Sequence, residues 1–496
     1  MMVHWGADRR QETPVSPRQP VTRIRARNFR SLEDVNVQLA PLTVLIGPNG
    51  SGKTNLLNVL RFLATTARFD LSAALQEWRG FDHIRRQNGR TGRVEIQIEG
   101  EVTDFATSVA PDSYTLVLSQ HSRSGRADLI RREEFTFKRR GGRGRRITVS
   151  GSHVTITEDD QEPVRRSLAS AQTTGLATLP KLSDEEGGLG IRRFTEFLSN
   201  ARLLEPDVSA AREPARQYGA SLAEDASNLA DALDTLRRTE PDAWDLLKSD
   251  VRRCLPGLRD IELVPVGGSA RAVAVQLVED GLVRPMELAD ASFGTVRLLA
   301  LFTALHEPDP PPFLAIEEID HGLHPYALEI LVDRLRAASA RTQILAATHL
   351  PTLVNRLEPQ EIVVCDRDPD TGASLIPAIS SDKIAAAIEE TGGVPASCGF
   401  PARWAACSHD GSAAPRKRRH PDLRGESQRL AKYRRTGVGR EPSPRRPSTC
   451  PAPSHVADQK GRQPRSEPLG RGNQRSGRGV PGGTAACRRC PRTSRR

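Results

Sequence analysis

Apolar and polar positions follow two different periods along residues 21–395, and their order predicts an α/β fold. The continuous apolar run Leu42, Val44, Leu45 and Ile46 predicts a buried strand, and a helix is expected over 55–66. Further short apolar or alternating segments predict strands at 21–29, 35–39, 94–102, 114–119 and 132–138. Because these strands follow one another closely, we expect an antiparallel sheet beside the first buried strand.

The second half of this region has a different pattern. Helical periodicity occupies 191–200, 222–236 and 243–254, and strands are expected at 261–266 and 272–278. We interpret this section as a helical insertion, too short and too poor in heptads for a long coiled coil. A helix through 296–302, a strand at 313–316, a helix over 326–338 and a strand at 343–347 follow.

Charge is distributed unevenly along the chain. The net charge is +11, but from Ala396 onward there are 24 Lys and Arg against 6 Asp and Glu, a net charge of +18. Residues 1–395 therefore carry −7, and the basic total says nothing about this part. Cys254 and Cys365 are the only cysteines in this part, which predicts a reducing compartment. The sequence contains no run of roughly 18 apolar residues, so no membrane span is predicted. We expect a cytoplasmic protein with no membrane partner.

A phosphate-binding P-loop follows the first buried strand. Its predicted nucleotide-binding residues are Gly47, Pro48, Asn49, Gly50, Ser51, Gly52, Lys53, Thr54 and Asn55. Glycines let backbone N–H groups surround the phosphates, Lys53 can reach the terminal phosphates, and the Thr54 hydroxyl can bind Mg²⁺. The expected ligands are therefore ATP and Mg²⁺.

Three later segments supply the other groups that hydrolysis needs. The strand at 313–316 ends in Glu317 and Glu318, so one carboxylate can face Mg²⁺ and the other can polarise the attacking water. His349 follows the strand at 343–347 and can hydrogen-bond the γ-phosphate. Ser292 and Gly294 begin a helix, where free N–H groups can face an anion; an ordinary helix cap is the alternative.

The order of these motifs resembles the ABC-type ATPase heads of the RecF, SMC and OLD-like families. The opening Ile24-Arg25-Ala26-Arg27-Asn28-Phe29-Arg30-Ser31 is similar to their first strand and turn. The acidic strand end followed by Gly322-Leu323-His324-Pro325 resembles the AAA family ATPases related to OLD proteins. The resemblance covers about residues 21–395 and includes the ATP-binding part only, without a nuclease domain.

This resemblance implies a homodimer whose two heads close head to tail around two ATP molecules. Ser292 and Gly294 of one head would meet the nucleotide that Lys53 and Thr54 of the other hold. By the same carry-over, Thr54 and Glu317 hold Mg²⁺, Glu318 is the base and His349 contacts the γ-phosphate. Asp320 and His324 would line the boundary between the heads, and Gln87 and Gln97 are both candidates for the family's glutamine loop.

The resemblance also suggests a division of the chain. We expect a disordered N-terminus (1–20), the N-terminal half of the head (21–160), the helical insertion (161–258), the C-terminal half (259–395) and a disordered basic tail (396–496). Back-translated with G/C-rich codons and read one frame over, residues 395–407 spell Gly-Glu-Leu-Trp-Phe-Ser-Gly-Ala-Leu-Gly-Gly-Val, which looks like the natural end of the family. This indicates a frameshift near residues 393–395, with a natural basic tail as the alternative.

Several functions remain open from the sequence. The first is an ATPase switch acting with DNA or a partner effector protein, in DNA repair, recombination or defence against mobile elements. A transporter's nucleotide-binding subunit fits less well, because the insert between Thr54 and Ser292 is far longer than in such subunits. A non-hydrolysing ATP-binding scaffold is a third. The basic, glycine-rich segment 141–146 predicts a solvated turn or hairpin tip, with a DNA contact as the alternative.

Overall fold

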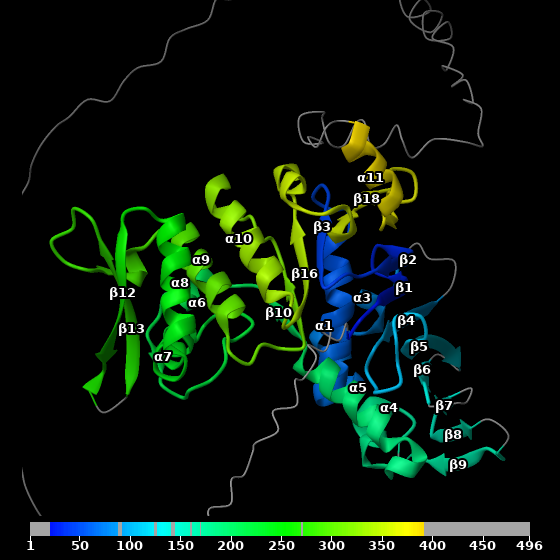
Figure 1. Cartoon of the computed structure of the whole chain (residues 1–496). Coiled ribbons are helices and arrows are strands. Elements are labelled where there is room, and N and C mark those ends of the chain that lie inside the picture. The colour runs from blue at the N-terminus through cyan, green and yellow to red at the C-terminus, as the bar shows by residue number, and fades with distance from the viewer. Residues whose placement is uncertain are drawn as a thin grey trace, which may run out of the picture. The chain divides into compact units, whose positions relative to one another are not determined.

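The structure is a computed structural model that describes residues 20–390 except 88–91, 124–125, 140–143, 159–160, 169 and 269–270 (Figure 1). The predictions for the N-terminus before residue 20 and for the tail from Ala396 onward lie outside the described residues. No helix in the described part combines the length and the apolar character that crossing a bilayer requires.

A five-stranded sheet forms the centre, in the order β10-β15-β16-β3-β17, and all its pairings are parallel. Its strands are β3 (Leu42–Ile46), β10 (Arg202–Leu204), β15 (Phe313–Ile316), β16 (Gln343–Thr348) and β17 (Ile362–Val364). Parallel strands buried on both faces need apolar side chains on both, which explains the continuous apolar runs at β3 and β15. The α/β fold class with its antiparallel subdomain is confirmed.

Helices cover both faces of this sheet. Leu42, Val44 and Ile46 of β3 pack into one hydrophobic core together with α9 (Phe293–His306) and α10 (Pro325–Ala338). Leu45, on the opposite face of the same strand, packs into a second core with α1 (Lys53–Phe69). Figure 1 shows α1 and α10 on either side of β3 and β16. The alternation of side chains along one strand thus joins the two cores.

The antiparallel sheet has eight strands in the order β2-β1-β4-β5-β6-β7-β8-β9. They are β1 (Arg23–Phe29), β2 (Leu32–Gln38), β4 (Arg93–Gly100), β5 (Asp112–Arg123), β6 (Arg126–Phe137), β7 (Arg145–Ser150), β8 (His153–Glu158) and β9 (Val164–Ser167). The sequence did not predict β7, β8 and β9. Arg145, assigned to the basic loop, is instead buried in β7, where it forms an ion pair with Glu158. The rest of the expected DNA-contacting tip lies largely outside the described residues.

The section predicted as a helical insertion contains helices and also one strand of the central sheet, β10. Its helices are α4 (Gly175–Thr178), α5 (Gly188–Asn200), α6 (Val208–Ala211), α7 (Leu229–Thr239) and α8 (Pro241–Cys254). The helix expected from residue 222 is wrong over its first seven residues, because α7 begins at Leu229. Asn228 accepts from the backbone of Ala223, and Asp225 accepts from Ser227, so these side chains stabilise turns rather than helix.

The remaining elements include two smaller sheets. A four-stranded sheet contains β11 (Ala215–Arg216), β12 (Leu258–Val266), β13 (Ala272–Glu279) and β14 (Met286–Glu287). A two-stranded hairpin of β18 (Asp366–Arg367) and β19 (Ser374–Leu375) follows β17. The other helices are α2 (Leu71–Glu77), α3 (Phe81–Ile84) and α11 (Ser381–Glu390).

Candidate active site

The P-loop lies at the carboxyl end of β3, between that strand and α1. Gly50 and Gly52 have φ angles of +80° and +103°, in the left-handed region that favours glycine. A Cβ atom on Gly47 would lie 2.0 Å from the carbonyl oxygen of Cys365, which follows β17. The loop therefore depends on glycine both for its backbone conformation and for its close contact with the next strand.

Lys53 is the first residue of α1 and is buried. Its Nζ donates hydrogen bonds to the carbonyl oxygens of Gly47 at 2.8 Å and Pro48 at 3.0 Å. Burial lowers the pKa of Lys53, while the carboxylates of the neighbouring acidic strand end oppose that shift. The ammonium group therefore points into the loop that a phosphate would occupy.

Thr54 and Glu317 meet across the site. The Thr54 hydroxyl donates a hydrogen bond to Glu317 Oε1. Burial raises the pKa of Glu317, and the hydrogen bond from Thr54 opposes this shift. A hydroxyl and a half-buried carboxylate together form the kind of oxygen donor set that Mg²⁺ prefers, so the two residues fit the ion.

Glu318 has an unusual backbone. Its φ angle is +50°, which is unfavourable for a residue with a side chain, and about half of its side chain is exposed. Arg297 of α9 is buried, and its Nη2 donates to the carbonyl oxygens of Glu317 at 2.7 Å and Glu318 at 2.8 Å. The Nδ1 of His321 lies 3.2 Å from Glu318 Oε2. Arg297 of α9 therefore fixes the backbone of the acidic strand end, while the Glu318 carboxylate stays accessible.

His349 follows β16 and pairs with Asp320. Its Nδ1 lies 2.9 Å from Asp320 Oδ2; the Asp320 carboxylate is fully buried, and the His349 side chain is 41% exposed. The expectation that Asp320 lines a boundary between two heads is therefore wrong for its carboxylate. Because the Asp320 carboxylate lies against Nδ1, Nε2 is the ring nitrogen that stays available to another partner.

One cavity of about 320 Å³ brings most of the predicted residues together. Its lining comprises Ser31, Asn49, Gly50, Gly52, Lys53, Thr54, Asn55, Glu317, Glu318, Ala347, His349 and Arg367. Sequence reasoning missed Ser31 and Arg367. Ser31 Oγ accepts from Asn55 Nδ2 at 2.6 Å and lies 2.6 Å from Ser374 Oγ. Neither Gln87 nor Gln97 is among the lining residues, so the glutamine loop stays unplaced.

Ser292 and Gly294 do not line this cavity. Ser292 caps α9, because its Oγ accepts from the backbone N–H of Thr295 at 3.1 Å. A Cβ on Gly294 would lie 2.2 Å from the Gly322 carbonyl oxygen, so the start of α9 packs against the loop that follows Glu318. His324 caps α10, with its Nδ1 3.3 Å from the Tyr326 nitrogen. The roles of these residues in a dimer stay predictions.

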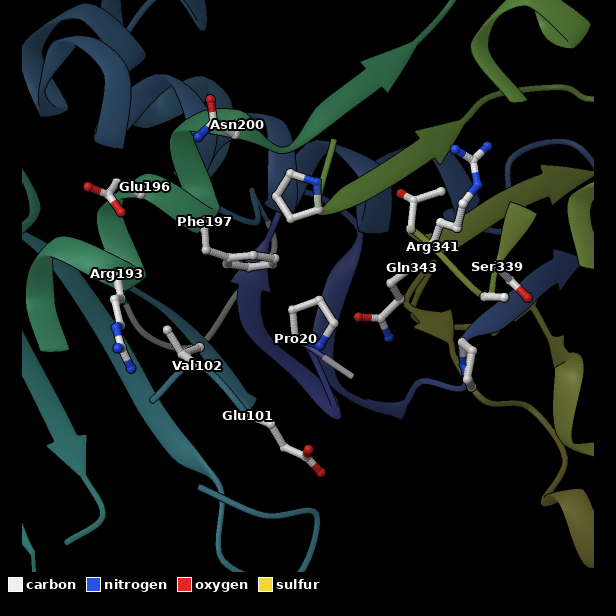
Figure 2. Close-up of a pocket in the computed structure, with 14 residues that line it drawn as sticks. Pro20, Glu101, Val102, Arg193, Glu196, Phe197, Asn200, Ser339, Arg341 and Gln343 are labelled. Atoms are coloured by element: carbon white, nitrogen blue, oxygen red, sulfur yellow. The ribbon is translucent and has the colours of Figure 1, made fainter. Parts of the chain in front are cut away.

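A larger cavity of about 490 Å³ lies at the other end of the central sheet, where Pro41, Pro312 and Gln343 mark the amino ends of strands. Figure 2 shows Phe197, Val102, Pro20 and Gln343 around it. The Gln343 amide is already bonded to the backbone of Val21. This cavity contains none of the predicted site residues, and ligands of open α/β sheets bind at the opposite, carboxyl ends of the strands.

The fold and the P-loop cavity define a nucleotide-binding protein of the P-loop class. Residues 42–355 match the family model described as "AAA domain, putative AbiEii toxin, Type IV TA system". The chain therefore belongs to this AAA domain family.

Two curated relatives show sequence similarity. The OLD nuclease of Thermus scotoductus is 30% identical over 104 residues, which are 18% of this chain and 20% of the relative. The DNA replication and repair protein RecF of Corynebacterium jeikeium is 43% identical over 89 residues, which are 16% of this chain and 21% of the relative. The chain thus spans about a fifth of the length of each of these relatives.

Among solved structures, an Smc head bound to the C-winged helix domain of ScpA aligns with 72% of this chain and 96% of its own chain. The sequence identity is 14% and the TM-score is 0.44. At this TM-score the likeness adds nothing to the description of the fold.

Proposed function

We propose that this chain binds ATP with Mg²⁺ and hydrolyses it. The observation that supports this most strongly is that one cavity collects Lys53 and Thr54 from the P-loop, Glu317 and Glu318 from the end of β15, and His349 from the end of β16. These segments are far apart in the sequence, and each supplies a different group that phosphoryl transfer to water needs.

Each of these residues has a separate role in the proposed reaction. Lys53 exchanges its bonds to the Gly47 and Pro48 carbonyls for phosphate oxygens. Thr54 and Glu317 would hold Mg²⁺, which when bound neutralises charge on the phosphates. Glu318, with its accessible carboxylate, orients a water molecule and accepts its proton. His349 donates to the γ-phosphate through Nε2 while Asp320 holds Nδ1.

The proposed assembly is a head-to-tail homodimer. Ser292 and Gly294 are not in the lining of their own chain's cavity, and the neighbouring Phe293 is 41% exposed. An exposed aromatic ring beside a helix N-terminus is consistent with a contact made on a second copy. ATP bound between the two copies would stabilise the closed dimer, and hydrolysis would release it.

The proposed process is genome maintenance or defence, since the curated relatives include RecF and an OLD nuclease. The effector would be DNA or a protein partner. The alternative function is a scaffold that binds ATP without turnover. The hydrolysis experiment below distinguishes an ATPase from such a scaffold.

The test is steady-state ATP hydrolysis by the full chain, with and without double-stranded DNA. Glu318→Gln should retain ATP binding and lose turnover, whereas Glu213→Gln, at an exposed glutamate outside the cavity, should hydrolyse like the unmodified protein. Light scattering of Glu318→Gln with ATP should show a dimer. ATP binding without turnover in the unmodified chain would favour the scaffold, and equal turnover in both variants would refute the role of Glu318. Stimulation by DNA would support the proposed process.

A further inference from the structure

The β18–β19 hairpin forms part of the wall of the nucleotide cavity. A Cβ on Gly52 of the P-loop would lie 2.0 Å from Ser374 Oγ of β19. Ser374 is in turn linked through Ser31 to Asn55 at the start of α1. Arg86 also connects the hairpin to the turn after β1, since its guanidinium donates to the carbonyl oxygens of Ser31 and Thr371. The hairpin is therefore fixed in position against the P-loop.

This hairpin presents Arg367 to the cavity. Its Nη1 lies 3.6 Å from the position that a Cβ on Gly50 would occupy, and the residue is among those that line the cavity. Its Nε donates to the Gly372 carbonyl oxygen at 3.2 Å, which orients the planar group. Between residues 20 and 390, no carboxylate in the described part forms an ion pair with this guanidinium.

A guanidinium without an ionic partner beside a P-loop has the chemistry of a phosphate ligand. Its terminal nitrogens carry N–H groups in a fixed planar arrangement that matches phosphate oxygens. The other cation of the cavity is Lys53, whereas Glu317 and Glu318 add negative charge. A polyphosphate entering this cavity therefore gains from a second cation.

We propose that Arg367 binds a phosphate oxygen of the nucleotide held by the P-loop. The hairpin is then a phosphate-binding element and more than a turn after β17. This inference rests on the proposed function only in assuming that the cavity binds a nucleotide.

Equilibrium binding of a fluorescent ATP analogue to the full chain, with unlabelled ATP, ADP and adenosine as competitors, tests the proposal. Arg367→Ala should weaken ATP binding about 10- to 100-fold and leave adenosine binding within about twofold. Arg367→Lys should recover part of the loss, because it restores charge without the planar group. Arg284→Ala, at an exposed arginine outside the cavity lining, serves as the matched control.

Two results would overturn the proposal. Unchanged ATP affinity in Arg367→Ala would show that the guanidinium does not meet the phosphates. An equal loss for ATP and adenosine, with no recovery in Arg367→Lys, would show that the hairpin only braces the P-loop. Failure of the unmodified chain to bind any nucleotide would instead refute the proposed function. Lys53→Ala is the negative control, which gives the signal expected when the P-loop does not bind nucleotide.

Discussion

Replacing Arg297 by alanine should both destabilise the fold and slow hydrolysis. Arg297 is 4% exposed, and one of its nitrogens donates to two consecutive carbonyl oxygens, those of Glu317 and Glu318. These bonds hold Glu318 at a φ of +50°, a conformation that a non-glycine residue keeps only when its surroundings enforce it. Without the guanidinium, the backbone at Glu318 can relax.

The magnitude follows from the lost contacts. Two hydrogen bonds from a charged donor contribute about 3 to 6 kcal/mol together. Burial lowers the pKa of Arg297, which shows that keeping this charge away from water is itself costly, and removal of the charge offsets part of the loss. We expect the free energy of unfolding to fall by about 2 to 4 kcal/mol. A displacement of the Glu318 carboxylate by about 1 Å would lower kcat about 100-fold.

Urea unfolding and single-turnover ATP hydrolysis on the same preparations measure both effects. Arg297→Lys should be intermediate, since one ammonium group can still donate to a carbonyl, and Arg284→Ala should match the unmodified protein. A kcat within threefold of normal despite a clear loss of stability would refute the idea that Arg297 positions Glu318. Unchanged stability would refute the energetic argument as a whole.

Three further predictions concern buried carboxylates. Asp320→Asn should lower kcat about tenfold at unchanged ATP affinity, because His349 loses a charged partner; unchanged single-turnover rates would contradict this. Burial alone would raise the pKa of Asp234, but hydrogen bonds from two arginines and a glutamine lower it overall. Its stabilising effect is therefore present above the ordinary pKa of aspartate and lost as the pH falls through the lowered value. Asp234→Asn should cost about 1 to 2 kcal/mol in urea unfolding at pH 7 and nothing in more strongly acidic solution; a constant difference would argue against the ion pairs. Glu133→Gln should cost about 3 to 5 kcal/mol in urea unfolding at pH 7, because Arg131 stays buried without its counter-charge; a loss below about 1 kcal/mol would contradict this.

The sequence predicted site residues where a recognisable motif follows a buried strand. Lys53, Glu317, Glu318 and His349 all follow apolar segments whose carboxyl ends must meet in a parallel sheet, so their convergence could be expected. Arg367 follows a buried strand too, but it lies among aspartates, proline and glycine that predict only a turn.

Other features depend on contacts between distant residues. The pairing of Asp320 with His349 depends on how two loops pack, so no spacing of residues along the sequence predicts it. The strand β10 was missed because three residues are too few to show a period, and its place is set by β15. Likewise, Ser31 belongs to the site only because the hairpin after β17 folds back on the P-loop.

The position of β3 has a consequence for how the protein is made. Its two neighbours, β16 and β17, are both translated about 300 residues after it. At about 5 to 20 residues per second, a ribosome needs roughly 15 to 60 s to deliver them. Throughout that interval the nascent P-loop strand has no partner in its own sheet, and the face that packs against α9 and α10 remains available to chaperones or to aggregation. The nucleotide cavity, whose lining extends to Arg367, can therefore be completed only after that residue has been made.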